Sequence, residues 1–149
     1  MKAHWGKQED GFTLVELLIV ILIIGVLSTI AIPVFLNQRK TANDTAVVSD
    51  VKNAALQVEN WLVSNNNALG MTTQDVTSLS IKKSEGVTLY LVKTKPGAMS
   101  KGYRVCGYHD NGKLYTSHDN ALVYDSSYGG LLKDTGTCGS PDSAGVPKL

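Results

Sequence analysis

One acidic side chain stands alone inside the most apolar stretch of this sequence. Between Phe12 and Leu36 the single ionisable residue is Glu16, and all its neighbours from Leu17 to Leu27 are apolar. A carboxylate inside a membrane costs roughly 2.5–3.5 kcal/mol on insertion scales, unless its side chain reaches the interface or meets a cation. The stretch contains no Lys or Arg, so a pairing cation has to come from another chain or from a new amino terminus.

Two cysteines are the next residues with a defined chemistry. Cys106 and Cys138 are the only cysteines in the chain. In an exported domain such a pair favours one disulfide, and two free thiols are the alternative. Closing a loop of this length stabilises a fold by about 3–4 kcal/mol in the chain-entropy description.

The triplet His-Asp-Asn occurs twice, at 109–111 and at 118–120. Its carboxylates, Asp110 and Asp119, together with Asp125, have the oxygen chemistry of a Ca²⁺ site. Turn formation accounts for the same residues without an ion, so we assign no metal and no cofactor. The sequence also lacks a phosphate-binding loop, a CxxC pair and a nucleophile elbow, and we expect no enzymatic activity.

Composition separates a lipid-compatible segment from a polar remainder. The 149 residues suit one domain, and 14 Lys and Arg against 13 Asp and Glu give a net charge of +1. Nucleic-acid binding is therefore possible but not indicated. As a helix, the apolar stretch 12–36 measures about 37 Å, which suffices to cross a hydrocarbon core of roughly 30 Å. We expect Gly25 and Pro33 to loosen this helix.

Two kinds of export segment fit this stretch. It is either a retained single-pass anchor or a secretory signal peptide cut after Ala31, which would release a secreted binding domain starting at Ile32. Glu16 and Pro33 both fit the secretory signal poorly.

The helical pattern continues beyond the apolar stretch. One stripe at helical spacing predicts a core-facing helix to about Val63; its members are Val47, Val51, Ala54, Ala55, Val58, Trp61 and Leu62. We place the opposite, polar face in solvent, with Asp44, Asp50, Lys52, Asn53, Glu59 and Asn60.

Strand patterns follow the helix. Alternation predicts strands at 87–93 and 102–109, and the turn residues Asp110-Asn111-Gly112 predict a hairpin into a third strand at 113–117. A fourth short strand is expected at 121–124, and loops from Asp125 onward. The expected fold is α+β, a long N-terminal helix packed on a small antiparallel sheet.

The segment from Gly11 to Glu16, Gly-Phe-Thr-Leu-Val-Glu before an apolar run, resembles the class III signal of type IV prepilins and related pseudopilins. The resemblance implies cleavage after Gly11 by a prepilin peptidase, which also N-methylates Phe12. Glu16 becomes the fifth residue of the mature chain, where this family keeps a glutamate that serves subunit assembly. Gly25 and Pro33 likewise fall where family members commonly place a Gly and a helix-loosening Pro.

The resemblance also implies an organisation and a function. It implies a leader at 1–11, a transmembrane and filament-core segment at 12–36, the amphipathic half of the same helix at 37–63, and a globular head at 64–149 with a disulfide-bounded C-terminal region. The expected function is that of a pilus subunit, held in the membrane and then assembled into a surface filament. Its expected partners are the peptidase, the assembly platform with its ATPase, the membrane and other copies of itself. A pseudopilin of a secretion or competence system is the alternative.

Overall fold

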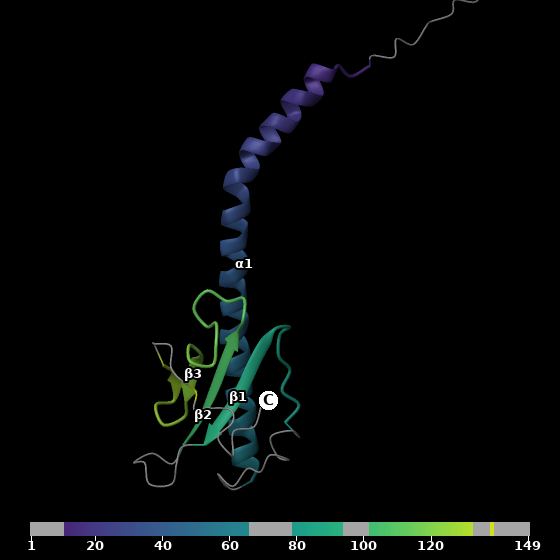
Figure 1. Cartoon of the computed structure of the whole chain (residues 1–149). Coiled ribbons are helices and arrows are strands. Elements are labelled where there is room, and N and C mark those ends of the chain that lie inside the picture. The colour runs from purple at the N-terminus through teal and green to yellow at the C-terminus, as the bar shows by residue number, and fades with distance from the viewer. Residues whose placement is uncertain (1–10, 66–78, 94–101, 133–137, 139–149) are drawn as a thin grey trace, which may run out of the picture. The chain divides into compact units, whose positions relative to one another are not determined.

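A computed structural model describes residues 11–65, 79–93, 102–132 and 138 of the chain. The chain divides into two compact units, with the boundary between Leu36 and Asn37. The elements, coloured in chain order in Figure 1, are α1 (Leu14–Ser64), β1 (Val87–Lys93), β2 (Tyr103–His109), β3 (Leu122–Asp125) and β4 (Gly130–Leu131).

The first unit contains the part of α1 up to Leu36. Every large apolar side chain from Leu14 to Leu36 is at least 50% exposed, so this part of the helix has no core of its own. By length and composition α1 can cross a membrane. The hydroxyl groups of Ser28 and Thr29 donate to backbone carbonyls of the preceding turn, at 2.7 Å in both cases. These polar side chains are therefore satisfied within the helix, as hydrocarbon requires.

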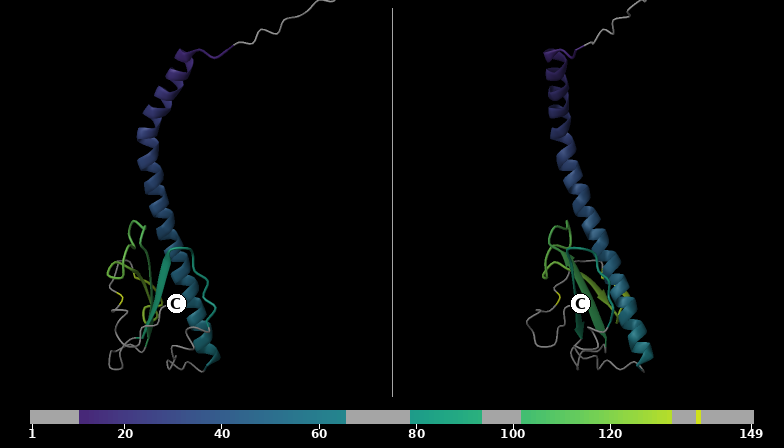
Figure 2. Two further views of the ribbon diagram at one scale, coloured as in Figure 1. Left: turned by 45° about the vertical axis from the view of Figure 1, so that its right-hand side comes forward. Right: turned by 90° about the vertical axis from the view of Figure 1, so that its right-hand side faces the viewer.

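In the second unit the rest of α1 lies along one face of the sheet, as the two views of Figure 2 show. The helix buries the stripe expected from the sequence, with Val47, Val51, Ala54, Ala55, Val58 and Leu62 at most 6% exposed and Trp61 half-buried at the margin. Leu89 and Leu91 of β1 and Val105 of β2 complete this core. The prediction of a core-facing helix is confirmed, and so is the α+β fold.

The sheet has the order β1-β2-β3-β4, with every neighbouring pair antiparallel. Because side chains alternate between faces, Leu89 and Leu91 meet the helix while Tyr90 lies on the other face. Gly107 lies opposite Leu89 in the register. A Cβ at this glycine would lie 2.5 Å from the Val51 side chain, so its absence lets α1 approach the sheet closely.

The expected hairpin from β2 into a strand at 113–117 is wrong. The turn forms, since the Gly112 N–H donates to the His109 carbonyl at 2.8 Å, but β2 pairs with β1 and β3 instead. The backbone N–H groups of residues 113–115 are bound by the Asp44 carboxylate of α1 and are not available for a strand ladder. The strand expected at 121–124 is present as β3, whereas the short strand β4 was not expected from the sequence.

The solvent-facing position predicted for Asp44 and Asp50 is also wrong. Their exposed fractions are 7% and 5%, and both carboxylates bind backbone N–H groups of the chain that packs against α1. Asp50 accepts from the Ser84 N–H at 2.6 Å, and the Ser84 carbonyl accepts from the Val87 N–H at the start of β1. Both acids therefore fix connecting segments onto the helix.

Candidate functional site

The residues at the start of α1 form a reciprocal hydrogen-bonded cap. The N–H of Glu16 donates to Thr13 Oγ1 at 3.2 Å, while Glu16 Oε2 accepts from the Thr13 N–H at 3.0 Å and from its hydroxyl at 2.8 Å. This is a capping box, which satisfies backbone donors that the first helical turn leaves unpaired. Gly11 and Phe12 precede it, and the Phe12 side chain is 90% exposed.

The cap leaves the charge of Glu16 uncompensated. Within the described residues, this carboxylate forms no ion pair, and its Oε1 atom accepts no hydrogen bond. A capping box works with Gln as well as with Glu, so the negative charge exceeds what the cap needs. The capping role was missed by the sequence interpretation, although the spacing Thr-x-x-Glu before an apolar run signals it.

Gly25 and Pro33 both lie inside α1. A Cβ added at Gly25 would meet nothing within 4 Å, so this glycine leaves a flat place on an exposed helix. Pro33 has no backbone N–H to donate to the preceding turn. The loosening of the helix at these two residues stays a prediction.

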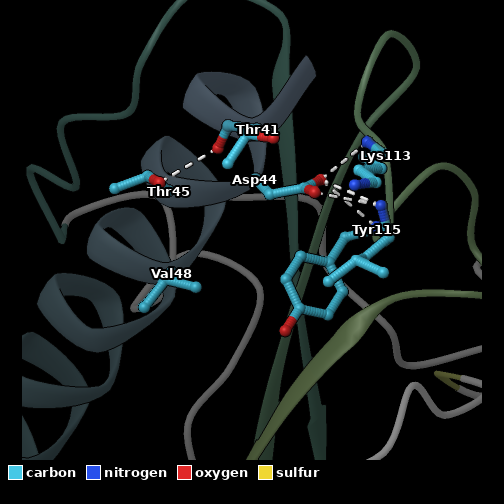
Figure 3. A pocket seen from close by; sticks show the side chains of 7 residues that line it. Thr41, Asp44, Thr45, Val48, Lys113 and Tyr115 are labelled. Atoms are coloured by element: carbon cyan, nitrogen blue, oxygen red, sulfur yellow. Dashed lines mark hydrogen bonds between the residues drawn. The ribbon is translucent and has the colours of Figure 1, made fainter. Parts of the chain in front are cut away.

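A second polar site joins α1 to the segment after β2 (Figure 3). Asp44 accepts N–H bonds from Lys113 at 2.9 Å and from Leu114 at 3.0 Å, with a longer contact of 3.4 Å to Tyr115. One residue earlier, the Asn43 side chain donates to the Asn111 carbonyl at 2.9 Å. A mainly apolar hollow of about 400 Å³ lies beside these bonds, lined by Thr41, Asp44, Thr45, Val48, Lys113, Leu114 and Tyr115.

A buried tyrosine joins the other end of α1 to the sheet. The Tyr103 hydroxyl lies 2.7 Å from Glu59 Oε1 and 3.2 Å from the Ala55 carbonyl. Burial, followed by the hydrogen bond to Glu59, raises the pKa of Tyr103 far above its ordinary value. This phenol therefore stays neutral across the physiological range.

The two cysteines form one disulfide, Cys106–Cys138, with 6.0 Å between their Cα atoms. Cys106 lies in β2 on the sheet face away from α1, so the bond ties residue 138 to the sheet. The predicted pairing is thus present in the structure.

Asp125 is bound within the sheet and does not join the other acids in an ion site. Its carboxylate, 1% exposed, lies 2.6 Å from Arg104 Nε and accepts the Ser127 N–H at 2.9 Å. Burial alone would raise the pKa of Asp125, but these hydrogen bonds outweigh it and hold that pKa below its ordinary value. Among the described residues, no group of three or more His, Cys, Asp or Glu side chains is placed to hold a metal ion.

The two His-Asp-Asn triplets serve local structure. His109 Nδ1 accepts the Asn111 N–H at 3.0 Å, and the Asn120 side chain donates to the Leu114 carbonyl at 2.8 Å. These are turn contacts of the kind expected for Asn.

Comparison with known proteins places this arrangement in a family. Residues 6–32 match the family described as the prokaryotic N-terminal methylation motif. The chain is 36% identical over 110 residues to the type IV wide pilus major component PilA4 of Thermus thermophilus, covering 73% of this chain and 80% of that protein. It is 30% identical over 107 residues to the type IV major alpha-pilin of Moraxella bovis, covering 71% of this chain and 65% of the relative.

A secretion protein is also among the relatives. The chain is 30% identical over 80 residues to the type II secretion system core protein G of Pseudomonas aeruginosa, covering 54% of this chain and 55% of that protein. No solved structure gives a significant match. The methylation motif, the long apolar helix on an antiparallel sheet and the extent of the match to the Thermus protein agree, and the chain belongs to the type IV pilin family.

Proposed function

We propose that this chain is a structural subunit of a type IV pilus, cleaved after Gly11, N-methylated at Phe12 and assembled from the membrane into a surface filament. The observation that carries the proposal is the match to a major pilus component over 80% of that relative's length. The exposed apolar helix supports it, because such a surface needs lipid before assembly and other subunits afterwards. The proposed segments are a leader at 1–11, a membrane and filament-core segment at 12–36, an amphipathic helix at 37–63 and a head at 64–149.

Cleavage before the apolar stretch supplies the cation that Glu16 lacks. The cut leaves the stretch on the mature chain and creates an α-amino group on Phe12. Two unit charges 4 Å apart attract by only about 1 kcal/mol in water and by several-fold more in a medium of lower dielectric constant. An unpaired buried carboxylate is costly, so pairing with the neighbouring subunit's amine favours the correct register of stacked helices.

The proposed partners follow from this life cycle. A prepilin peptidase and methyltransferase acts on the Gly11–Phe12 junction, and an assembly platform with its ATPase moves the subunit out of the membrane. Other copies of the chain then cover the apolar helix. The protein is a single-pass membrane protein before assembly and part of an extracellular filament afterwards.

The capping box provides a sharp test of the charge. Glu16→Gln removes the charge but keeps a side chain that can complete the box, whereas Thr13→Ala weakens the box and keeps the charge. We expect the Glu16→Gln chain to insert and be cleaved, yet to form no filaments, and the Thr13→Ala chain to form them. The readouts are the mass of the membrane-bound subunit and electron microscopy of sheared filaments. Normal filaments from the Glu16→Gln strain would refute the pairing.

A pseudopilin is the second candidate, and the match to a type II secretion core protein favours it. Both candidates share the helix and its processing, so the filament itself distinguishes them. Long surface filaments that disappear when the gene is deleted indicate a pilin. Their absence, together with loss of protein secretion, indicates a pseudopilin.

A further inference from the structure

Three exposed cations and an exposed leucine lie in two segments of the second unit, the beginning of its helix and the turn that Asp44 binds. Arg39, Lys40 and Lys113 are exposed, and Leu114, which follows the turn at 109–112, is 53% exposed. We call these four residues the basal patch, because Arg39 and Lys40 are the charged residues that directly follow the apolar stretch 12–36.

The helix and the turn bring these residues together. Arg39 and Lys40 precede Asn43 and Asp44 by four residues, so each lies one turn away on the same side of α1. Asn43 and Asp44 are the residues that hold the backbone of 111–115. Lys113 and Leu114 are therefore fixed beside the helix, about one turn beyond the two helical cations.

Within the described part of the chain, no ion pair neutralises the positive charges of the basal patch. The ion pairs among the described residues are Arg104–Asp125 and His118–Asp119, and neither includes a basal-patch residue. The nearby acids are Asp44, which is buried against backbone N–H groups, and Asp110, which is exposed on the same turn.

We propose that the basal patch binds the anionic phospholipid headgroups of the membrane that stores the subunit, an inference that rests on the proposed function. The headgroup layer extends roughly 5–8 Å beyond the hydrocarbon core. With a rise of 1.5 Å per residue, Arg39 and Lys40 lie about 5–6 Å beyond Leu36 along α1, within that layer. Asp44, which binds the Lys113 N–H, lies about one helical turn after Lys40, and the long flexible stem of Lys113 can span such a distance to the phosphates.

The contact is electrostatic and therefore reversible. Each Lys or Arg near an anionic surface strengthens binding by about fivefold, and the attraction falls off within a Debye length of about 8–10 Å. This reversible contact orients the head of a subunit held in the membrane and still allows the subunit to leave the membrane and join a filament.

The test uses the full chain with Leu114→Cys carrying a spin label, since Cys106 and Cys138 are bonded to each other. One chain is placed in each nanodisc, made of phosphatidylcholine alone or with about 30% phosphatidylglycerol. We expect the anionic lipid to lower the label's accessibility to a water-soluble nickel chelate by about threefold, and about 0.5 M salt to reverse this protection. Lys113→Glu should abolish the protection, whereas Lys52→Glu, on an exposed position of α1 elsewhere, should leave it intact.

Equal accessibility in the two lipids would overturn the proposal. Protection that ignores lipid charge but requires two chains in one disc would also overturn it and would make the basal patch a subunit interface. The proposed function is tested separately: if the wild-type chain forms filaments while the labelled chain shows no protection, only the headgroup contact is refuted.

Discussion

Asp44 offers a strong single perturbation of the head, because its carboxylate binds three successive backbone N–H groups. Hydrogen bonds to a charged group contribute about 1.5–3 kcal/mol each when buried. The N–H groups of Lys113 and Leu114 belong to exposed residues and can bind water once released, and the bond to Tyr115 is long at 3.4 Å. We therefore expect Asp44→Ala to lower the free energy of unfolding by about 3 kcal/mol, and Asp44→Asn by about half as much, since it keeps one acceptor oxygen.

Urea unfolding of the full chain in mild detergent measures this loss. The chain has two tryptophans, and replacing Trp5 by Phe leaves Trp61, at the margin of the helix-sheet core, as the reporter. Asp110→Ala is the matched control, because this acid is exposed on the same turn and should change stability by less than about 0.5 kcal/mol. If Asp44→Ala unfolds at the same urea concentration as the control, the carboxylate does not hold the turn and the reasoning fails.

Two further predictions concern the sheet and its disulfide. Asp125 has a pKa below its unfolded value, so its ionised form contributes stability at neutral pH that is lost as the pH falls through the folded-state pKa. Asp125→Asn should therefore lose less stability than wild type between about pH 6 and about pH 2, and equal losses in the urea midpoint would contradict this. Cys138→Ser should cost about 3–4 kcal/mol of unfolding free energy. Reduction of the wild type, or Cys106→Ser added to Cys138→Ser, should give the same urea midpoint, and a further drop in the double variant would indicate a separate role for Cys106.

Local sequence patterns were sufficient to predict α1, β1 and β2. The valines of α1 recur at helical spacing, and the alternation in Val87–Lys93 survives because one face of that strand is buried against α1. The cysteine pairing was also predictable, since the chain has only two cysteines.

Contacts between distant segments decided what the sequence could not. The Asn-Gly turn is a strong local hairpin signal, but Asp44, 69 residues before Lys113, binds the amides that a third strand needed. Asp44 also lies on the same face of α1 as the apolar stripe, because it precedes Val47 by three residues and Val51 by seven. This spacing is that of a buried position, but charged residues are usually exposed, so burial was not predicted. The backbone N–H groups that Asp44 binds can be identified only from the fold.

At Glu16 the sequence showed the charge and the structure added the cap. Glu16 therefore has two roles: it completes the capping box, and it carries a charge that pairs with no cation among the described residues. Glu16→Gln keeps the first role and removes the second, so this variant distinguishes them.

The mass of the subunit in sheared surface filaments tests the central claim most directly. The claim is that the apolar helix is kept on the mature chain and becomes the filament core. It predicts a chain that begins at Phe12, carries one extra methyl group at its amino terminus and contains the Cys106–Cys138 disulfide. A mature chain that starts at Ile32, or a surface form that retains Met1–Gly11, would contradict it.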